Sequence, residues 1–200
     1  MSDFAAESWD DRYRNNQDRW DLGCPAPPLI NLLASAQSPQ PGRMAVLGCG
    51  KGQDAMLFST AGFDVIGFDF ARTAIEYAQA TAQARALTTQ FLQRNIFELE
   101  TAFFQEFDYV LEHNCFCTID PTLRSRYVEV VKNLLRPEGQ LIALFLTHHR
   151  SDVPPFSINP QAILELFAPD FDVILFKAAK DSIVSRRGKE HLGIFQVRAT

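Results

Sequence analysis

The segment Gly48-Cys49-Gly50-Lys51-Gly52 places glycine at alternate positions directly after a short apolar run. Glycine has no Cβ, so such a loop can turn tightly and bring its backbone close to a ligand. The spacing differs from the GxGxxG pattern that seats a dinucleotide pyrophosphate on a helix N-terminus. It suits a ligand without phosphates, and a plain tight turn is the alternative explanation.

An acidic side chain follows at a position suited to a ribose. Asp69 ends the next predicted strand, Val65-Ile66-Gly67-Phe68-Asp69. A carboxylate there can accept hydrogen bonds from both ribose hydroxyls. The alternative is that Asp69 caps the helix predicted to begin near Ala71. The order of the glycine loop and the acid favours ribose binding.

Asn95 and Ile96 follow the third predicted strand. In α/β folds with such a glycine loop and strand-end acid, residues at this position contact an adenine ring. The amide oxygen of Asn95 can accept a hydrogen bond from the exocyclic amine, although more weakly than the aspartate that many such enzymes have there. Ile96 would pack on the face of the ring. An ordinary loop asparagine explains this segment equally well.

Three aromatic residues, Trp9, Tyr13 and Trp20, stand in an otherwise polar N-terminal segment. Trp9 and Tyr13 are four positions apart, so they share a face if the segment is helical. Aromatic faces attract a desolvated cation by about 1–2 kcal/mol, so this set can enclose a positively charged ligand. It can equally well pin the segment to the core.

Strands and helices are predicted to alternate along the rest of the chain, after proline-rich breaks at residues 24–28 and 38–42. The predicted strands cover residues 44–47, 64–68, 89–92, 107–111, 140–147, 172–177 and 193–198, and the predicted helices cover residues 29–36, 54–61, 71–86, 121–135 and 160–167. Such alternation implies right-handed crossovers and a mostly parallel sheet. The last two strands have only a loop between them and are expected to pair antiparallel.

We therefore expect an α/β fold: a Rossmann-like, seven-stranded, mostly parallel sheet with one antiparallel strand and helices on both faces. Ligands of such sheets bind outside the carboxyl ends of the strands. The 200 residues suit a single domain. Within it, residues 1–28 are expected to form an N-terminal aromatic lid segment and residues 43–200 the Rossmann-like core.

Composition restricts the partners and the location. The net charge is −5, and no block of Lys and Arg follows a nucleic-acid backbone or marks a membrane surface. The longest apolar run, residues 141–146, is far too short for a membrane span. The polar, acidic N-terminus does not resemble a signal peptide, so we expect a cytoplasmic protein. Nucleic acid and membranes are not expected as partners.

The cysteines form no CxxC pair and are expected to be free thiols in a reducing compartment. They are Cys24, Cys49, Cys115 and Cys117. Cys115 and Cys117 are interpreted as buried thiols, because two cysteines alone do not make a zinc site. No metal is expected.

Taken together, these motifs resemble the thiopurine S-methyltransferase superfamily, and most of all its plant and microbial halide/thiol methyltransferase branch. The stretches that carry the resemblance are W-DDR-Y-RNNQDR-W-DLG, AVLGCGKGQD, VIGFDFA, RNIFEL, CFCTIDPTLRSRY, LLRPEGQLIAL, PPFSI and RRGKEHLG. They run in order over nearly the whole chain and include N-terminal aromatic residues that generic methyltransferases lack.

The resemblance implies a class I methyltransferase that uses S-adenosyl-L-methionine and methylates a small soft nucleophile: a thiol, a halide or thiocyanate, with thiopurine-type S-methylation as a further activity. It implies that the three aromatic residues form the cofactor lid. By the same resemblance Gly48 lies beside the methionine part, Asp69 on the ribose, and Asn95 with Ile96 at the adenine. Tyr13 stands where plant relatives often have tryptophan.

The resemblance also implies roles for three further residues. His113 falls where relatives place a tyrosine or an arginine beside the cofactor. Arg186 and Arg187 match the family's similar tail and would offer positive charge to an anionic acceptor, although a solvated loop is the alternative. His113 and Asn95 both depart from the commoner residues at their positions.

Methyl transfer from a sulfonium is an in-line displacement, so alignment of the nucleophile can supply most of the catalysis. A thiol with a pKa of about 8.5 is partly ionised near neutral pH, and a halide has no proton to lose. If a thiol must be activated, His113 is the first candidate for the base, with an ordinary pKa of about 6.5; a structural histidine is the alternative.

Two other functions remain open at this point. Asp69 would also suit the ribose of a nicotinamide cofactor in an NAD-dependent oxidoreductase, but the glycine spacing and the lack of a convincing hydride-transfer acid argue against it. A non-catalytic S-adenosylmethionine-binding module is the other alternative. The expected partner is a small-molecule nucleophile, and the expected oligomeric state is a monomer.

Overall fold

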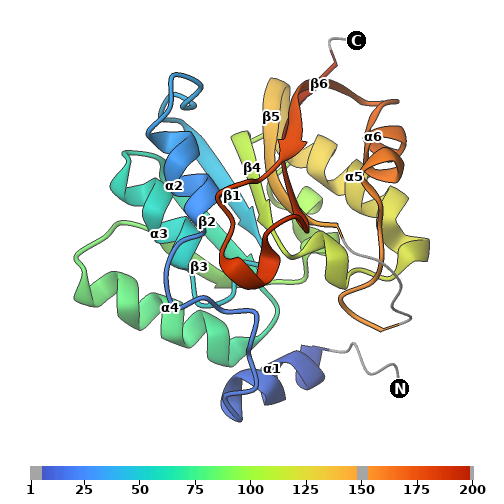
Figure 1. Cartoon of the computed structure of the whole chain (residues 1–200). Helices are drawn as coiled ribbons and strands as arrows, with labels where there is room; N and C mark the ends of the chain where they lie inside the picture. The colour runs from blue at the N-terminus through green and yellow to red at the C-terminus, as the bar shows by residue number, and fades with distance from the viewer. Residues whose placement is uncertain (1–5, 148–152, 199–200) are drawn as a thin grey trace.

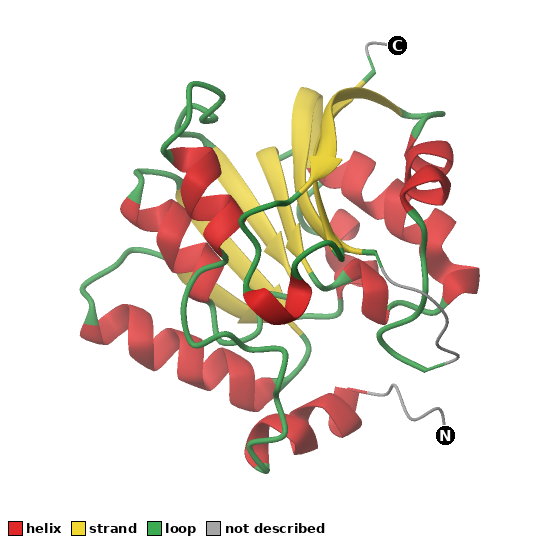
Figure 2. Cartoon of the chain, in the orientation of Figure 1, coloured by secondary structure: helices red, strands yellow, loops and turns green. Residues whose placement is uncertain are grey.

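Seven strands form a single sheet within residues 6–147 and 153–198, which are the residues that the computed structural model describes. The strand order is β3-β2-β1-β4-β5-β7-β6 (Figures 1 and 2). The strands are β1 (Arg43–Leu47), β2 (Asp64–Asp69), β3 (Gln90–Gln93), β4 (Phe107–His113), β5 (Leu135–Leu146), β6 (Phe171–Ala178) and β7 (Glu190–Val197). Residues 1–5, part of the N-terminus on which the cytoplasmic prediction rests, lie outside the described residues.

Helices cover both faces of this sheet, as Figure 2 shows in red. The α-helices are α1 (Ala6–Arg14), α2 (Pro27–Leu33), α3 (Gln53–Thr60), α4 (Arg72–Ala84), α5 (Arg124–Leu134) and α6 (Pro160–Phe167). Short 3₁₀ helices are η1 (Ile96–Thr101), η2 (Phe116–Thr118), η3 (Pro121–Leu123) and η4 (Val184–Arg186). In the described part of the chain, no helix has the length and apolar character that crossing a bilayer requires.

The strand pairing confirms the expected Rossmann-like fold. β1 pairs in parallel with both β2 and β4, β2 with β3, and β4 with β5, whereas β7 runs antiparallel to β5 and β6. The chain therefore leaves β1 in one direction to build β2 and β3 and later crosses to β4. The loops after β1 and β4 diverge at this switch, which opens a crevice at the carboxyl ends of the strands.

The helix and strand around residue 135 differ from the prediction. Helix α5 ends at Leu134 and β5 begins at Leu135, whereas the sequence predicted a helix through residue 135 and a strand from residue 140. Pro137 disfavours the helical conformation at Arg136 and cannot donate a backbone hydrogen bond. Leu135 instead pairs with Phe107 of β4, and the register then shifts before Tyr109.

The core lies in two layers, one on each face of the sheet. One hydrophobic cluster packs α2, α3 and α4 against the sheet, and the other packs η1, α5 and α6 against the opposite face. The second cluster is rich in phenylalanine. Phe167 of α6 is fully buried, and its ring lies 5.2–6.0 Å from the rings of four other phenylalanines, namely Phe116, Phe145, Phe171 and Phe195.

This packing predicts a large cost for truncating Phe167. Phe167→Ala removes a fully buried ring and leaves a cavity, so we expect it to lower the free energy of unfolding by about 3–5 kcal/mol. Phe104, which is 59% exposed, is the control: Phe104→Ala should change the same quantity by less than about 0.5 kcal/mol. Urea denaturation measures both, and equal effects would show that the cluster around α6 is not tightly packed.

Candidate active site

A cavity of about 450 Å³ opens at the carboxyl ends of β1, β2 and β4. Nine of the ten residues predicted to form the site line it, and they come from six separate segments of the chain. They are Trp9, Tyr13, Trp20, Gly48, Asp69, Asn95, Ile96, His113 and Arg186. The tenth, Arg187, is exposed and does not belong to the lining. The volume is typical of small-molecule sites.

The glycine loop turns from β1 into α3 with backbone angles that favour glycine. Gly48 and Gly50 have φ of +59° and +52°, a region that residues with a Cβ adopt only with strain. There is also no room for a side chain: a Cβ on Gly48 would lie 2.7 Å from Sγ of Cys115, and one on Gly50 would lie 2.9 Å from the hydroxyl of Tyr13. The loop is therefore both a tight turn and a bare backbone wall of the cavity.

Asp69 joins this loop to the next helix. The backbone N–H of Gly50 donates to Oδ2 at 2.9 Å, and that of Ala71, just before α4, donates to Oδ1 at 2.9 Å. Burial raises the pKa of Asp69, and the backbone hydrogen bonds oppose that rise. A carboxylate has about four lone-pair directions, so two remain for a ligand. Asp69 is not the helix cap that was the alternative interpretation, because Ala71 is the N-cap of α4 and no side chain caps that helix. Asp69 lines the cavity, and its contact with a ribose stays a prediction.

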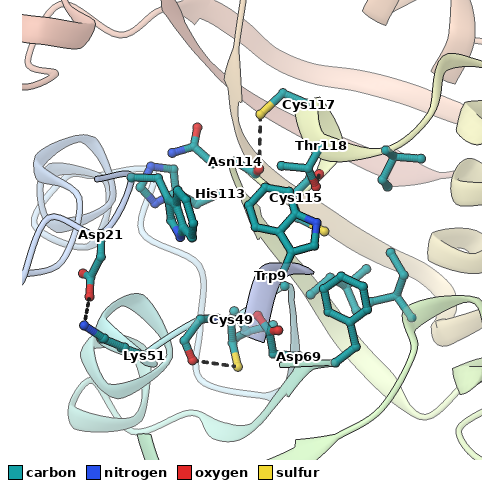
Figure 3. A pocket seen from close by; sticks show the side chains of 18 of the residues that line it. Trp9, Asp21, Cys49, Lys51, Asp69, His113, Asn114, Cys115, Cys117 and Thr118 are labelled. Atoms are coloured by element: carbon teal, nitrogen blue, oxygen red, sulfur yellow. Dashed lines mark hydrogen bonds and ion pairs between the residues drawn. The ribbon is translucent and has the colours of Figure 1, made fainter. Parts of the chain in front are cut away.

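The three aromatic residues pack on one another at the mouth of the cavity. The Trp20 ring lies edge-on to Trp9 at 5.0 Å and to Tyr13 at 5.5 Å, and its Nε1 donates to the Tyr13 hydroxyl at 3.1 Å. Figure 3 shows Trp9 among the side chains around the pocket. Helix α1 lies beside α4 (Figure 1), and Oδ1 of Asp10 accepts from the backbone N–H of Thr73 there at 2.7 Å.

Asn95 has a local partner that the sequence did not reveal. Its Oδ1 accepts from the backbone N–H of Phe97 at 3.1 Å and so caps η1. That bond leaves one lone pair of the oxygen for a ligand, and the adenine role of Asn95 stays a prediction. Phe70, directly after Asp69, also lines the cavity and was missed; its only signal is a large apolar side chain next to the strand-end acid.

His113, at the end of β4, is held between charged groups. Its Nδ1 lies 2.7 Å from Oδ2 of Asp54, while its Nε2 lies 3.0 Å from Nη1 of Arg186 and 3.7 Å from Oε1 of Glu190. Burial is the largest influence on His113 and lowers its pKa, as does the charge of Arg186. The charge and hydrogen bond of Asp54 and the contact with Glu190 together exceed these effects and raise the pKa to about 9. The Asn114 amide fits this group when its oxygen faces Arg186.

These contacts bear on the proposed base. Nδ1 faces a carboxylate and Nε2 faces a guanidinium and a second carboxylate, so both ring nitrogens are engaged in either protonation state. A general base needs a free lone pair within reach of the proton that it removes. The geometry favours a positioning role for His113, and catalysis by its ring stays a prediction.

All four cysteines line the cavity, which their spacing in the sequence did not indicate. Burial raises the pKa of Cys49, Cys115 and Cys117, and the nearby carboxylates of Asp69 and Glu112 raise these values further. The thiols therefore stay protonated near neutral pH. They are free, and among residues 6–147 and 153–198 no three His, Cys, Asp or Glu side chains are arranged to hold a metal ion.

Glu112 is a second group that the sequence analysis missed. It is fully buried on β4, and its Oε2 accepts from the backbone N–H of Phe116 at 2.5 Å. Burial raises its pKa to about 7, against the backbone hydrogen bonds and the charge of His113. The carboxyl thus ties the loop that carries Cys115 and Cys117 to the end of β4.

The chain is similar to known methyltransferases over its whole length. The family model for thiopurine S-methyltransferase matches residues 4–200. A probable thiol methyltransferase 2 of Arabidopsis thaliana is 28% identical over 204 residues, covering 100% of this chain and 89% of that protein. Thiocyanate methyltransferase 1 of Brassica oleracea is 28% identical over 190 residues, covering 92% of this chain and 82% of that protein.

A solved structure supports the fold alone. It is a 1,6-didemethyltoxoflavin-N1-methyltransferase of Burkholderia thailandensis with bound 1,6-didemethyltoxoflavin and S-adenosylhomocysteine, and its sequence is 18% identical to this chain. The TM-score is 0.78, and the alignment covers 98% of this chain and 88% of that one. This chain and the Burkholderia thailandensis protein therefore share the same type of Rossmann-like sheet.

The contacts of His113 predict a pH dependence of stability. Because its pKa is raised to about 9, from about 6.5 in an unfolded chain, its contribution is complete below about pH 6.5 and is lost as the pH rises through about 9. We expect His113→Gln to melt at least a few degrees below the wild type at about pH 6, and the difference to shrink by about pH 9.5.

Thermal melts across this range measure the difference. His191→Gln is the control, because the pKa of His191 is lowered by burial, so its difference from the wild type should stay constant between about pH 7 and 9.5. A His113→Gln difference that is constant or grows with pH would contradict the ion pair with Asp54.

Proposed function

We propose that this chain, which belongs to the thiopurine S-methyltransferase family and is an S-adenosyl-L-methionine-dependent methyltransferase, transfers the methyl group to a small soft nucleophile: a thiol, a halide or thiocyanate. Relatives named for thiol and thiocyanate methylation support this choice of acceptor. The observation that carries the proposal is one cavity in which a bare glycine backbone, a buried carboxylate and a set of aromatic rings meet.

The residues present fit the cofactor. Gly48 and Gly50 leave a wall without side chains for close backbone contact, and Asp69 keeps two acceptor directions for the ribose hydroxyls. Asn95 and Ile96, at the start of η1, would hold the adenine. The rings of Trp9, Tyr13 and Trp20 would cover the sulfonium, a cation that aromatic faces stabilise in a desolvated site.

When bound, S-adenosyl-L-methionine supplies a methyl group on a positively charged sulfur. The task of the chain is then to exclude water and to hold the acceptor in line with that methyl group. Ile119, Leu123 and Leu146 contribute apolar side chains to the cavity lining, and the charge of Arg186, which also lines it, is paired with Glu190. A soft nucleophile suits an apolar wall, and an anionic one arrives without a proton to lose, so no base is needed.

The two alternatives are less well supported. Relatives in the family are named as methyltransferases and not as oxidoreductases, and the GxGxG loop lacks the dinucleotide spacing. A non-catalytic module that only binds the cofactor would keep the same cavity, and it differs from the enzyme only in turnover.

The setting of the enzyme is also part of the proposal. We infer a single domain, with residues 1–28 as the lid segment and residues 43–200 as the core, that works as a monomer in the cytoplasm. The free thiols and the net charge of −5 support this reading, and the same charge speaks against a nucleic-acid partner.

Removing the Asp69 carboxylate should weaken cofactor binding. We expect Asp69→Ala to raise the Kd for S-adenosylmethionine at least tenfold, about 1.4 kcal/mol, because the ribose loses its acceptors. Asp69→Asn keeps the side-chain shape, so its Kd should lie between those of the wild type and Asp69→Ala. Asp64→Ala, at the exposed start of the same strand, is the control and should bind normally. Calorimetry on the folded variants measures each Kd. Unchanged affinity in Asp69→Ala would show that Asp69 does not bind the cofactor.

A panel of acceptors tests the activity itself. We expect methylated product from at least one of a thiol, hydrosulfide, iodide, thiocyanate and a thiopurine, detected by mass spectrometry with S-adenosylmethionine as the donor. Tight cofactor binding without turnover on any of them would favour the non-catalytic module. Reduction of NAD with a hydroxylated substrate, and no cofactor-dependent methylation, would favour the oxidoreductase.

A further inference from the structure

Arg186 lies in η4, between β6 and β7, and its side chain crosses to the N-terminal segment. Its Nη2 donates to the backbone carbonyl of Trp20 at 2.6 Å, a contact between residues 166 positions apart. The side chain is only 12% exposed. Backbone carbonyls of surface loops are normally satisfied by water. Trp20 is half-buried, and its carbonyl accepts from a charged donor instead, which makes this a specific contact.

A socket of polar groups holds the guanidinium in this place. Its Nη1 lies 3.3 Å from Oε1 of Glu190, which is 2% exposed, and 3.0 Å from Nε2 of His113. The Asn114 amide oxygen can accept from Nη1 at 2.7 Å. Guanidinium nitrogens point in fixed directions, so the groups that hold Nη1 also direct Nη2 at Trp20.

The same stretch of the N-terminal segment is held from the other side by the glycine loop. Nζ of Lys51 lies 2.5 Å from Oδ2 of Asp18 and 3.6 Å from Oδ2 of Asp21, the second of which Figure 3 draws. Trp20 stands between these aspartates. Residues 18–21 are therefore tied to the glycine loop by Lys51 and to the segment between β6 and β7 by Arg186.

We propose that Arg186 is a positioning residue that fastens the aromatic lid over the cavity through the Trp20 carbonyl. Because the Trp20 ring contacts both Trp9 and Tyr13, fixing its backbone fixes the whole set. Glu190 acts through Arg186 by holding it, whereas protonated His113 lies beside the guanidinium as a second cation that Asp54 balances. The effect on methyl transfer rests on the proposed function, whereas the closure of the lid does not.

Tryptophan fluorescence can report on the aromatic lid. The two tryptophans of the chain, Trp9 and Trp20, both belong to the lid, so all tryptophan fluorescence reports on this segment. We expect Arg186→Gln to increase acrylamide quenching about twofold without any cofactor present. Arg186→Lys keeps a charge but not the fork of donors and should quench to an intermediate degree. Arg187→Gln, the exposed neighbour with the same change of charge, should leave the quenching as in the wild type.

Cofactor affinity and kinetics separate positioning from direct acceptor binding. A loosened lid should raise the Kd and the KM for S-adenosylmethionine about five- to tenfold in Arg186→Gln, with a smaller effect in Arg186→Lys and a melting temperature close to that of the wild type. Normal quenching together with a raised KM for thiocyanate or thiol alone would overturn the proposal and make Arg186 an acceptor contact.

Two further outcomes also test the role of Arg186. If Arg186→Gln does not fold, the same quenching and affinity measurements are made on Arg186→Lys. Wild-type quenching together with a wild-type Kd in that variant would overturn the positioning role of Arg186. If Arg186→Gln increases the quenching but the wild-type protein has no affinity for S-adenosylmethionine, the positioning role of Arg186 is supported and the proposed function is contradicted. The two proposals can therefore fail separately.

Discussion

The carboxylate of Asp69 links the parts of the site at the tip of β2. One oxygen accepts from Gly50 in the loop after β1, and the other accepts from Ala71 at the start of α4. The two crossovers that leave neighbouring parallel strands are thereby fixed to each other. Since α1 docks on α4 through Asp10 and Thr73, the N-terminal aromatic residues are positioned from the same point. A change at Asp69 is felt by the loop, the helix and the aromatic rings together.

Charge is distributed around the cavity in balanced groups. Two carboxylates, Asp54 and Glu190, face two basic groups, His113 and Arg186, on the side of β4 and β7. Lys51 faces Asp18 and Asp21 near the glycine loop. Buried charges are costly unless paired, and here the pairing also spans segments that are distant in sequence. The same contacts that satisfy the charges bring the N-terminal segment onto the core.

The sequence was sufficient for the fold and for the place of the cavity, because both depend on local patterns. Alternating apolar strands and helices, and a glycine loop followed by Asp69, each leave a signature within a few residues. The limits appear where contacts join distant segments. Nothing around Arg186 indicates that it reaches Trp20, and nothing near His113 indicates Asp54 as its partner. The cavity-lining cysteines come from separate segments and were missed for the same reason. Phe70, Glu112 and the capping role of Asn95 depend on local contacts, but no sequence pattern marks those contacts.

The cysteines of the cavity wall have a consequence for a methyltransferase. The attacking species in the alkylation of sulfur is the thiolate, and a thiol in water has the opportunity to ionise. Cys49, Cys115 and Cys117 have no such opportunity, because burial and the neighbouring carboxylates keep their protons in place. Three sulfur atoms of the cavity wall thus keep their protons near neutral pH, so they offer no thiolate that would compete with an acceptor for a methyl group.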